Sequence, residues 1–272
     1  MSVNTMLGVL FGFGLFIGAV LLSTNNYIIF LSLPSLLMVG GGTLAAAFIS
    51  YESRYVLLGL KNILSILIIQ RVGRNVLNFE VGRIIRWGYV VQAKGPLALE
   101  QEIKALKRED KFLGFGVELL VTGYNGTEVR NIMGNAADCT FERSVVQADI
   151  IKNMGATAPA FGMIGTLVGL VVMLDNLSGD LSELGKGMSL ALITTLYGVL
   201  FARLVFIPAA SKIRQREEIK RFRNYLVAEG LAMLADRKNP RYVQDMMNSF
   251  LDPAIHFNID QQLKQRAGGK AA

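Results

Sequence analysis

Four stretches of the chain are almost free of charged residues and are long enough to cross a membrane as helices. They cover residues 3–22, 27–49, 156–174 and 187–210. A transmembrane helix needs about 20 mostly apolar residues, because the hydrocarbon core of a bilayer is about 30 Å thick. The first stretch has no basic n-region and no small-residue cleavage site, so we expect a retained span rather than a signal peptide. The pattern predicts an all-α integral membrane protein with four transmembrane helices.

The hydrophobic pattern between the second and third spans is that of amphipathic helices. Residues 97–107 place apolar side chains near one face and Glu and Lys on the other, and Pro96 stands where this helix would begin. Gly123 is predicted to end the next helix, and Thr127 to cap a long helix that leads into the third span. The predicted domains are residues 1–49 (spans one and two), 50–154 (a helical cytoplasmic domain), 155–210 (spans three and four) and 211–272 (a helical cytoplasmic tail).

The distribution of positive charge predicts the orientation of the spans. Residues 50–155 hold fourteen Lys and Arg, and the tail from Arg203 holds thirteen, whereas the loop 175–186 holds only Lys186 against three acids. Because basic loops stay on the cytoplasmic side, both long basic segments and both termini are predicted to be cytoplasmic. Contact with anionic lipid accounts for the net charge of +7, so we expect no nucleic-acid partner.

Composition narrows the chemistry further. The 272 residues are 52% hydrophobic and 18% charged, which fits a membrane protein with substantial aqueous parts. A single cysteine, Cys139, cannot form an internal disulfide, and a single histidine, His256, stands in no metal-ligand cluster. The sequence has no glycine-rich phosphate loop in a strand-turn-helix setting and no hydrolase triad, so we expect neither an enzyme nor a cofactor.

The third and fourth predicted spans each have one face made of small and hydroxyl-bearing residues. On the third span this face holds Gly155, Pro159, Gly162, Thr166, Gly169 and Met173, and on the fourth it holds Gly187, Ala191, Thr194, Thr195, Gly198 and Ala202. Small residues let helix backbones approach closely in lipid. We therefore expect both faces to pack closely against something, a partner helix in particular.

Two interpretations of these faces stay open on residue chemistry alone. The threonines can serve packing, each bonding to a carbonyl one turn earlier, and a lone proline can be only a kink. Alternatively, Pro159 frees a carbonyl near residue 155, and carbonyls with hydroxyls offer oxygens to a passing cation. The cores of the four spans contain no Asp, Glu, Lys or His. If ions cross here, the carboxylate that conduction normally needs belongs to another polypeptide.

Several segments of the chain resemble the MotA/PomA family of flagellar stator subunits. The resemblance rests on APAFGMIGTLVGLVVMLDNL, ALITTLYGVLFARLVFIPAASK, PSLLMVGGGTLAAAFI, GPLALEQEI and KNPRYV, of which the first two together are specific. It implies a pentamer in the bacterial inner membrane around two copies of a MotB/PomB-type partner. That partner would supply a transmembrane Asp and a peptidoglycan-binding domain. Ion flow would be coupled to rotation, with the cytoplasmic domain acting on the rotor protein FliG.

The resemblance assigns roles to individual residues. Pro159 and Pro208 resemble the family's coupling prolines, and Thr166 and Thr195 resemble the two hydroxyls that line the path in sodium-type members. The full predicted ion pathway is Thr166, Thr194, Thr195, Pro159, Gly162, Ala191 and Tyr197. Because dehydrated Na⁺ needs several hard oxygen ligands, whereas a proton needs only a carboxylate and water, we expect transport of Na⁺ rather than H⁺.

Rotor contact is assigned in the same way. Glu100 resembles the family's rotor-facing acid, while the companion basic position, eight residues earlier, is Gln92 here, so Lys94 or Arg86 is expected to replace it. The basic stretch 212–223 is predicted to bind anionic lipid headgroups. Two alternatives remain: an energy-transducing channel subunit of the ExbB/TolQ type, and a non-conducting membrane scaffold.

Overall fold

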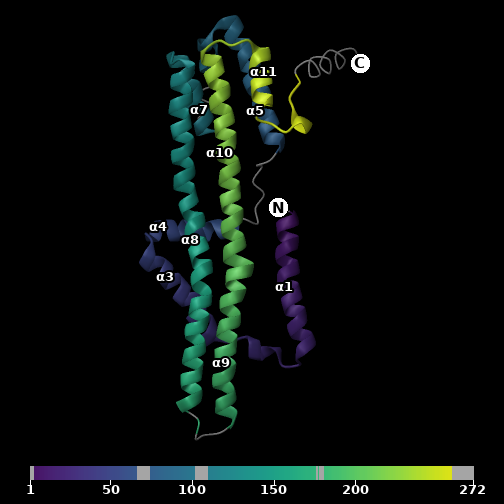
Figure 1. Ribbon diagram of the computed structural model, residues 1–272, viewed down its shortest axis with the longest axis vertical. Helices are drawn as coiled ribbons and strands as arrows, with labels where there is room; N and C mark the ends of the chain where they lie inside the picture. Colours follow the sequence, from purple (N-terminus) through teal and green to yellow (C-terminus); the bar gives the residue numbers. More distant parts are fainter. Residues whose placement is uncertain (1–2, 66–73, 102–109, 176, 178–180, 259–272) are drawn as a thin grey trace. The chain divides into compact units, whose positions relative to one another are not determined.

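The computed structural model describes residues 3–65, 74–101, 110–175, 177 and 181–258 (Figure 1). Every regular element within these residues is a helix, which confirms the predicted all-α class. The chain divides into two compact units. The first unit contains Met1–Gln70 and Arg143–Gln215, and the second contains Arg71–Glu142 and Arg216–Ala272. Two long helices, α8 (Gly126–Asp175) and α10 (Ile207–Ala235), contribute residues to both.

The first unit holds the membrane spans. Its elements are α1 (Val3–Ser23), η1 (Tyr27–Phe30), α2 (Leu33–Leu36), η2 (Leu37–Gly41), α3 (Gly42–Ser50), α4 (Ser53–Ser65), the end of α8, α9 (Leu181–Leu200), η4 (Phe201–Phe206) and the start of α10. Among the described residues, four helical segments are long and apolar enough to cross a membrane; three contain the predicted spans, and the first, Met6–Ser23, overlaps the predicted span 3–22. The protein is therefore a multi-pass membrane protein.

In the described residues, two wide helical turns interrupt the spans, and neither is predicted by the sequence pattern. The segments η2 and η4 are π-helical. The first follows Pro34, and Thr43, which is buried, donates a hydrogen bond of 2.6 Å to the carbonyl of Val39 inside it. The second ends two residues before Pro208. Pro208 has no N–H to give to the carbonyl of Leu204 in the preceding turn, and the wide turn there rearranges the backbone hydrogen bonds without breaking the helix. Such turns are frequent at functional sites.

The second unit has its own hydrophobic core. Its elements are α5 (Arg74–Lys94), η3 (Pro96–Leu99), α7 (Lys111–Thr122), α11 (Pro240–Asn248), η5 (Pro253–Ile255), the first part of α8 and the last part of α10. All of these elements except η5 and η3 are helices of two or more turns. The fully buried side chains of the core include Ile84, Ile85, Leu113, Val117, Met133, Leu231 and Met247. Their burial is what holds the helices together.

Helix ends in the second unit follow the sequence with one exception. Gly123 ends α7 in the left-handed conformation (φ 96°), as predicted, because a residue without Cβ adopts it freely. The prediction that Thr127 caps the next helix is wrong. Asn125 is the cap: its Oδ1 accepts from the N–H of Glu128 (2.9 Å), and the Glu128 carboxylate accepts from the N–H of Asn125 (3.0 Å). Pro96 begins a short 3-10 turn, and the rest of the predicted helix 97–107 lies largely outside the described residues.

Candidate functional site

The end of α8 and the helix α9 approach each other until their backbones are nearly in contact. A Cβ atom added to Gly162 would lie 3.1 Å from the Cα of Thr195, and one added to Gly198 would lie 3.1 Å from the Cα of Pro159. A Cβ atom added to Gly169 would lie closer still, 2.7 Å from the backbone nitrogen of Ala191. The small faces of the two spans therefore pack against each other within the chain. The sequence analysis expected close packing but not that each face would supply the other's partner.

Four oxygen atoms from the two helices gather at this contact. The hydroxyl of Thr166 lies 3.1 Å from the carbonyl oxygen of Gly162 and 3.2 Å from that of Ala191. The hydroxyl of Thr195 lies 3.3 Å and 3.5 Å from the same two carbonyls, and the two hydroxyls are hydrogen-bonded to each other. Both threonines are partly exposed. These two hydroxyls and two carbonyls, which we call the oxygen cluster, offer the hard, uncharged oxygens that an alkali cation prefers.

Two other predicted pathway residues lie apart from the oxygen cluster's hydroxyls. Thr194 is buried, and its hydroxyl donates back to the carbonyls of Leu190 (3.0 Å) and Ala191 (2.9 Å) while its side chain fills the space above Gly165. The hydroxyl of Tyr197 donates to the carbonyl of Phe30 in η1. Thr194 thus serves helix packing in the described chain, and Tyr197 connects the fourth span to the start of the second.

The two predicted coupling prolines flank one level of the helix pair. Pro159 lies inside α8, against Gly198 of α9. One turn earlier, a Cβ on Gly155 would lie 2.8 Å from Ile207 Cγ1, next to Pro208. Because Pro159 has no N–H, the Gly155 carbonyl loses its helical donor beside the end of η4. The prolines therefore disturb the backbones of neighbouring helices at nearly the same place.

The predicted rotor-facing residues are all exposed and belong to the second unit. Arg86 lies on the outer face of α5, and Lys94 is the last residue of that helix. Glu100 follows η3. Gly95 makes the turn between the end of α5 and η3: its φ of 81° suits glycine, and its N–H donates to the carbonyl of Val91 (2.8 Å). Gln92 is also exposed. The structure leaves these side chains accessible, and rotor contact stays a prediction.

The basic stretch 212–223 pairs largely with acids of the same chain. Arg214 contacts Asp149 (3.2 Å), Lys220 contacts Glu217 (2.6 Å) and Arg221 contacts Asp138 (2.6 Å). Much of its charge is therefore neutralised within the chain. Contact of this stretch with anionic lipid stays a prediction.

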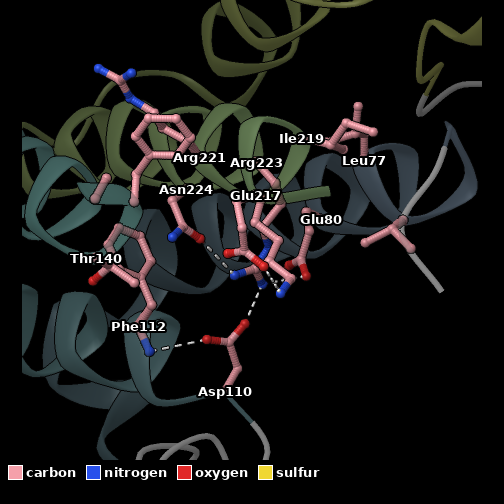
Figure 2. Close-up of a pocket in the computed structure, with 14 residues that line it drawn as sticks. Leu77, Glu80, Asp110, Phe112, Thr140, Glu217, Ile219, Arg221, Arg223 and Asn224 are labelled. Atoms are coloured by element: carbon pink, nitrogen blue, oxygen red, sulfur yellow. Dashed lines mark hydrogen bonds and ion pairs between the residues drawn. The ribbon is translucent and has the colours of Figure 1, made fainter. Parts of the chain in front are cut away.

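Arg223 occupies the centre of a largely buried charge cluster that sequence reasoning missed: the side chains of Glu80, Arg223 and Asp110 are 6%, 14% and 26% exposed. It reaches between Glu80 of α5 (2.6 Å) and Asp110, beside a cavity of about 380 Å³ in the second unit (Figure 2). Asp110 also caps α7 through the N–H groups of Phe112 and Leu113. Burial opposes the charge of Arg223, but attraction by Glu80 and Asp110 outweighs burial, and the pKa of Arg223 is raised above its ordinary value. The cluster ties α5, α7 and α10 together.

Comparison with known proteins places the chain in a family. A model of the MotA/TolQ/ExbB proton channel family matches residues 104–224. Motility protein A of Aquifex aeolicus is 30% identical over 90% of this chain and 94% of its own length. The chain belongs to the MotA/PomA family. Chemotaxis protein PomA of Vibrio alginolyticus is 29% identical over 93% of this chain and 96% of its own length, and protein YtxD of Bacillus subtilis is 34% identical over 88% and 86%.

Solved structures of this family share the fold. A chain of the MotAB structure from C. jejuni superposes with a TM-score of 0.83, covering 93% of this chain and 97% of that one at 23% identity. A chain of the flagellar MotAB stator complex from Bacillus subtilis gives 0.80, with 95% and 97% covered at 21% identity. The MotA/PomA fold is therefore present over nearly the whole chain.

Proposed function

We propose that the chain is the ion-conducting stator subunit of a bacterial flagellar motor, which couples Na⁺ flow to torque on the rotor. Membership of the MotA/PomA family supports the motor assignment. The observation that carries the choice of ion is the oxygen cluster, in which the hydroxyls of Thr166 and Thr195 meet two backbone carbonyls across the helix contact. Hard oxygens in this number are what a partly dehydrated Na⁺ requires, whereas a proton does not need them.

The partner in this proposal is a MotB/PomB-type subunit that supplies the titrating carboxylate. The cores of the four spans contain no acidic residue, so a cation at the oxygen cluster meets no counter-charge from this chain. The related chains of known structure come from MotAB complexes, which supports a partner of this kind. We further propose a pentamer around two copies of the partner, in the inner membrane, with both termini cytoplasmic.

Torque in this proposal comes from repeated, gated transfer of ions. One elementary charge that crosses 100 mV releases about 2.3 kcal/mol, which can bias a small rotation but cannot sustain torque without many transfers. Pro159 and Pro208 gate the transfer of ions in this proposal. Each proline weakens the backbone hydrogen bonds of its own helix, and the two weakened places lie next to each other. Arg86, Lys94 and Glu100 act on the rotor protein FliG, since their side chains are exposed on the second unit.

The proposal is tested by sodium flux in sealed vesicles that contain the chain together with its partner. Vesicles with the chain alone, and vesicles in which the partner's transmembrane Asp is changed to Asn, serve as controls. We expect sodium uptake only with the intact pair. A selective current from the chain alone would refute the proposal that the partner supplies the carboxylate of the ion site. Proton flux without sodium flux would refute the choice of ion. An assembled complex that conducts neither ion would favour the scaffold.

A further inference from the structure

The segment that follows α11 folds back and is fastened to that helix by a reciprocal pair of hydrogen bonds. The side-chain amide of Asn248 donates to the carbonyl of Phe257 (2.9 Å), and its Oδ1 accepts from the N–H of Phe257 (2.9 Å). Asn248 and Phe257 are both buried. Between them, Asp252 caps η5 through the N–H of Ala254 (2.9 Å). Residues 249–258, which we call the latch, thus have a defined path across the second unit.

The ring of Phe257 lies directly on the backbone of α5. A Cβ atom added to Gly82 would lie 2.6 Å from Cε2 of this ring and 3.1 Å from Cζ, so only glycine leaves room for it. Phe257 is 6% exposed and belongs to the same core as Val81 and Ile85. The latch therefore packs on α5 at Gly82, and α11, from which the latch continues, lies alongside α5 in Figure 1.

Helix α5 is held from more than one direction and still leaves charged side chains free. On α10, Gly230 makes room for Ile84, and Arg223 pairs with Glu80. The latch adds Phe257 over Gly82. Arg86 and Lys94 of the same helix remain exposed. A helix transmits a lateral force only while the contacts that fix it to the rest of the protein stay formed. Short irregular segments are usually the first part of a protein to open.

We propose that the latch fixes α5 against the reaction force of the rotor, and that Phe257 and Asn248 are positioning residues for torque. This inference rests on the proposed function, because it takes α5 to be the helix that meets the rotor. Neither residue contacts an ion or, in this proposal, the rotor itself. Opening of the latch leaves the oxygen cluster unchanged, since both positioning residues belong to the second unit and the oxygen cluster to the first. Loss of the latch should therefore separate torque from ion flow.

The test compares three variants of the full chain, each expressed with its partner. Phe257→Ala removes the ring, Phe257→Leu keeps an apolar side chain, and Phe250→Ala is the matched control, because Phe250 lies in the same segment and is 41% exposed. The measurements are torque per stator unit at high load, speed near zero load, and sodium flux in vesicles. Asn248→Ser provides a second variant, since it releases both hydrogen bonds and leaves the ring in place.

We expect Phe257→Ala to lower high-load torque per unit by about twofold or more, because the weakened latch opens under force. Flux and near-zero-load speed should stay at the wild-type values, Phe257→Leu should recover part of the torque, and Phe250→Ala should behave as wild type. Unchanged high-load torque in both Phe257→Ala and Asn248→Ser would overturn the inference. A parallel loss of flux and torque would also overturn it, by showing a general folding defect. Failure of the wild-type pair to conduct would instead refute the proposed function.

Discussion

Thr166 and Thr195 each present one hydroxyl proton to a choice of several acceptors. The two carbonyls of Gly162 and Ala191 lie within 3.1–3.5 Å of both hydroxyls, and the hydroxyls also contact each other. Two protons cannot satisfy all of these contacts at once, so lone pairs remain for a cation. The bond from each threonine to the carbonyl one turn earlier, which packing alone would produce, is present as well. The oxygen cluster can therefore keep the packing bonds of the two helices and still offer oxygen lone pairs to a cation.

Replacement of Thr166 by alanine removes one ligand oxygen while the glycine contacts between the helices remain. We expect the sodium concentration for half-maximal swimming speed to rise about five- to tenfold, which corresponds to about 1–1.5 kcal/mol for one lost interaction. Thr157→Ala is the matched control, because the Thr157 hydroxyl in the same helix bonds only to Asn153 O (2.8 Å) in the described residues. Speed plotted against sodium concentration that coincides for Thr166→Ala and wild type would remove the sodium assignment.

At the scale of elements, proline and the π-helical turns set where the spans can bend. Pro159 interrupts the hydrogen bonds of α8 opposite Gly198, and η4 ends just before Pro208. A helix interrupted in this way has a lower cost of bending at one level than elsewhere. Because Gly155 packs against Ile207, a bend in α8 is passed directly to the junction of η4 and α10.

Leucine in place of Pro159 should straighten α8. The new N–H can donate to the Gly155 carbonyl, and removal of an interior proline stabilises a helix by up to about 3 kcal/mol. We expect Pro159→Leu to assemble with the partner and reach the membrane in normal amounts but to give no rotation. Pro34→Leu is the control, since Pro34 lies in the first turn of α2, where an N–H has no helical acceptor. Normal torque from the Pro159→Leu motor would exclude a gating role for this proline.

At the scale of the whole molecule, each unit is held together by a different kind of contact. The first unit depends on close backbone packing of small residues, as expected where lipid replaces water and the hydrophobic effect between helices is absent. The second unit depends on an apolar core and on the buried cluster around Arg223. Removal of one member of such a cluster leaves uncompensated buried charge.

Arg223→Met is therefore expected to destabilise the second unit by about 2–3 kcal/mol, because Glu80 keeps only its longer ion pair with Arg83 (3.5 Å) and Asp110 loses its cation but is 26% exposed. The matched control is Arg214→Met, whose ion pair with Asp149 is about half exposed and is worth about 0–1 kcal/mol. The difference is measured by heating the purified complex and using protease cleavage within the second unit as the readout of unfolding. Equal stability of the two variants would show that the cluster contributes no more than a surface ion pair. Addition of Glu80→Gln to Arg223→Met should recover part of the loss.

The sequence by itself determined the four spans, the helical class, the family and the two small faces, because hydropathy, periodicity and motif order depend on local residue patterns. The end of α7 at Gly123 was predictable for the same reason. The capping error at Asn125 and Thr127 arose because both residues are good caps and only the path of the chain selects one.

Only the tertiary structure decided which oxygens meet. The hydroxyl of Thr195 shares acceptors with that of Thr166, while the side chain of Thr194 packs on Gly165 and the Tyr197 hydroxyl bonds to Phe30. These contacts depend on the rotation of α9 against α8, which the pattern of a single helix does not fix. The π-helical turns, the cluster around Arg223 and the contact of Phe257 with Gly82 likewise join residues far apart in the chain. Their positions follow from how complete helices pack, since packing selects among many pairings that the local sequence permits equally.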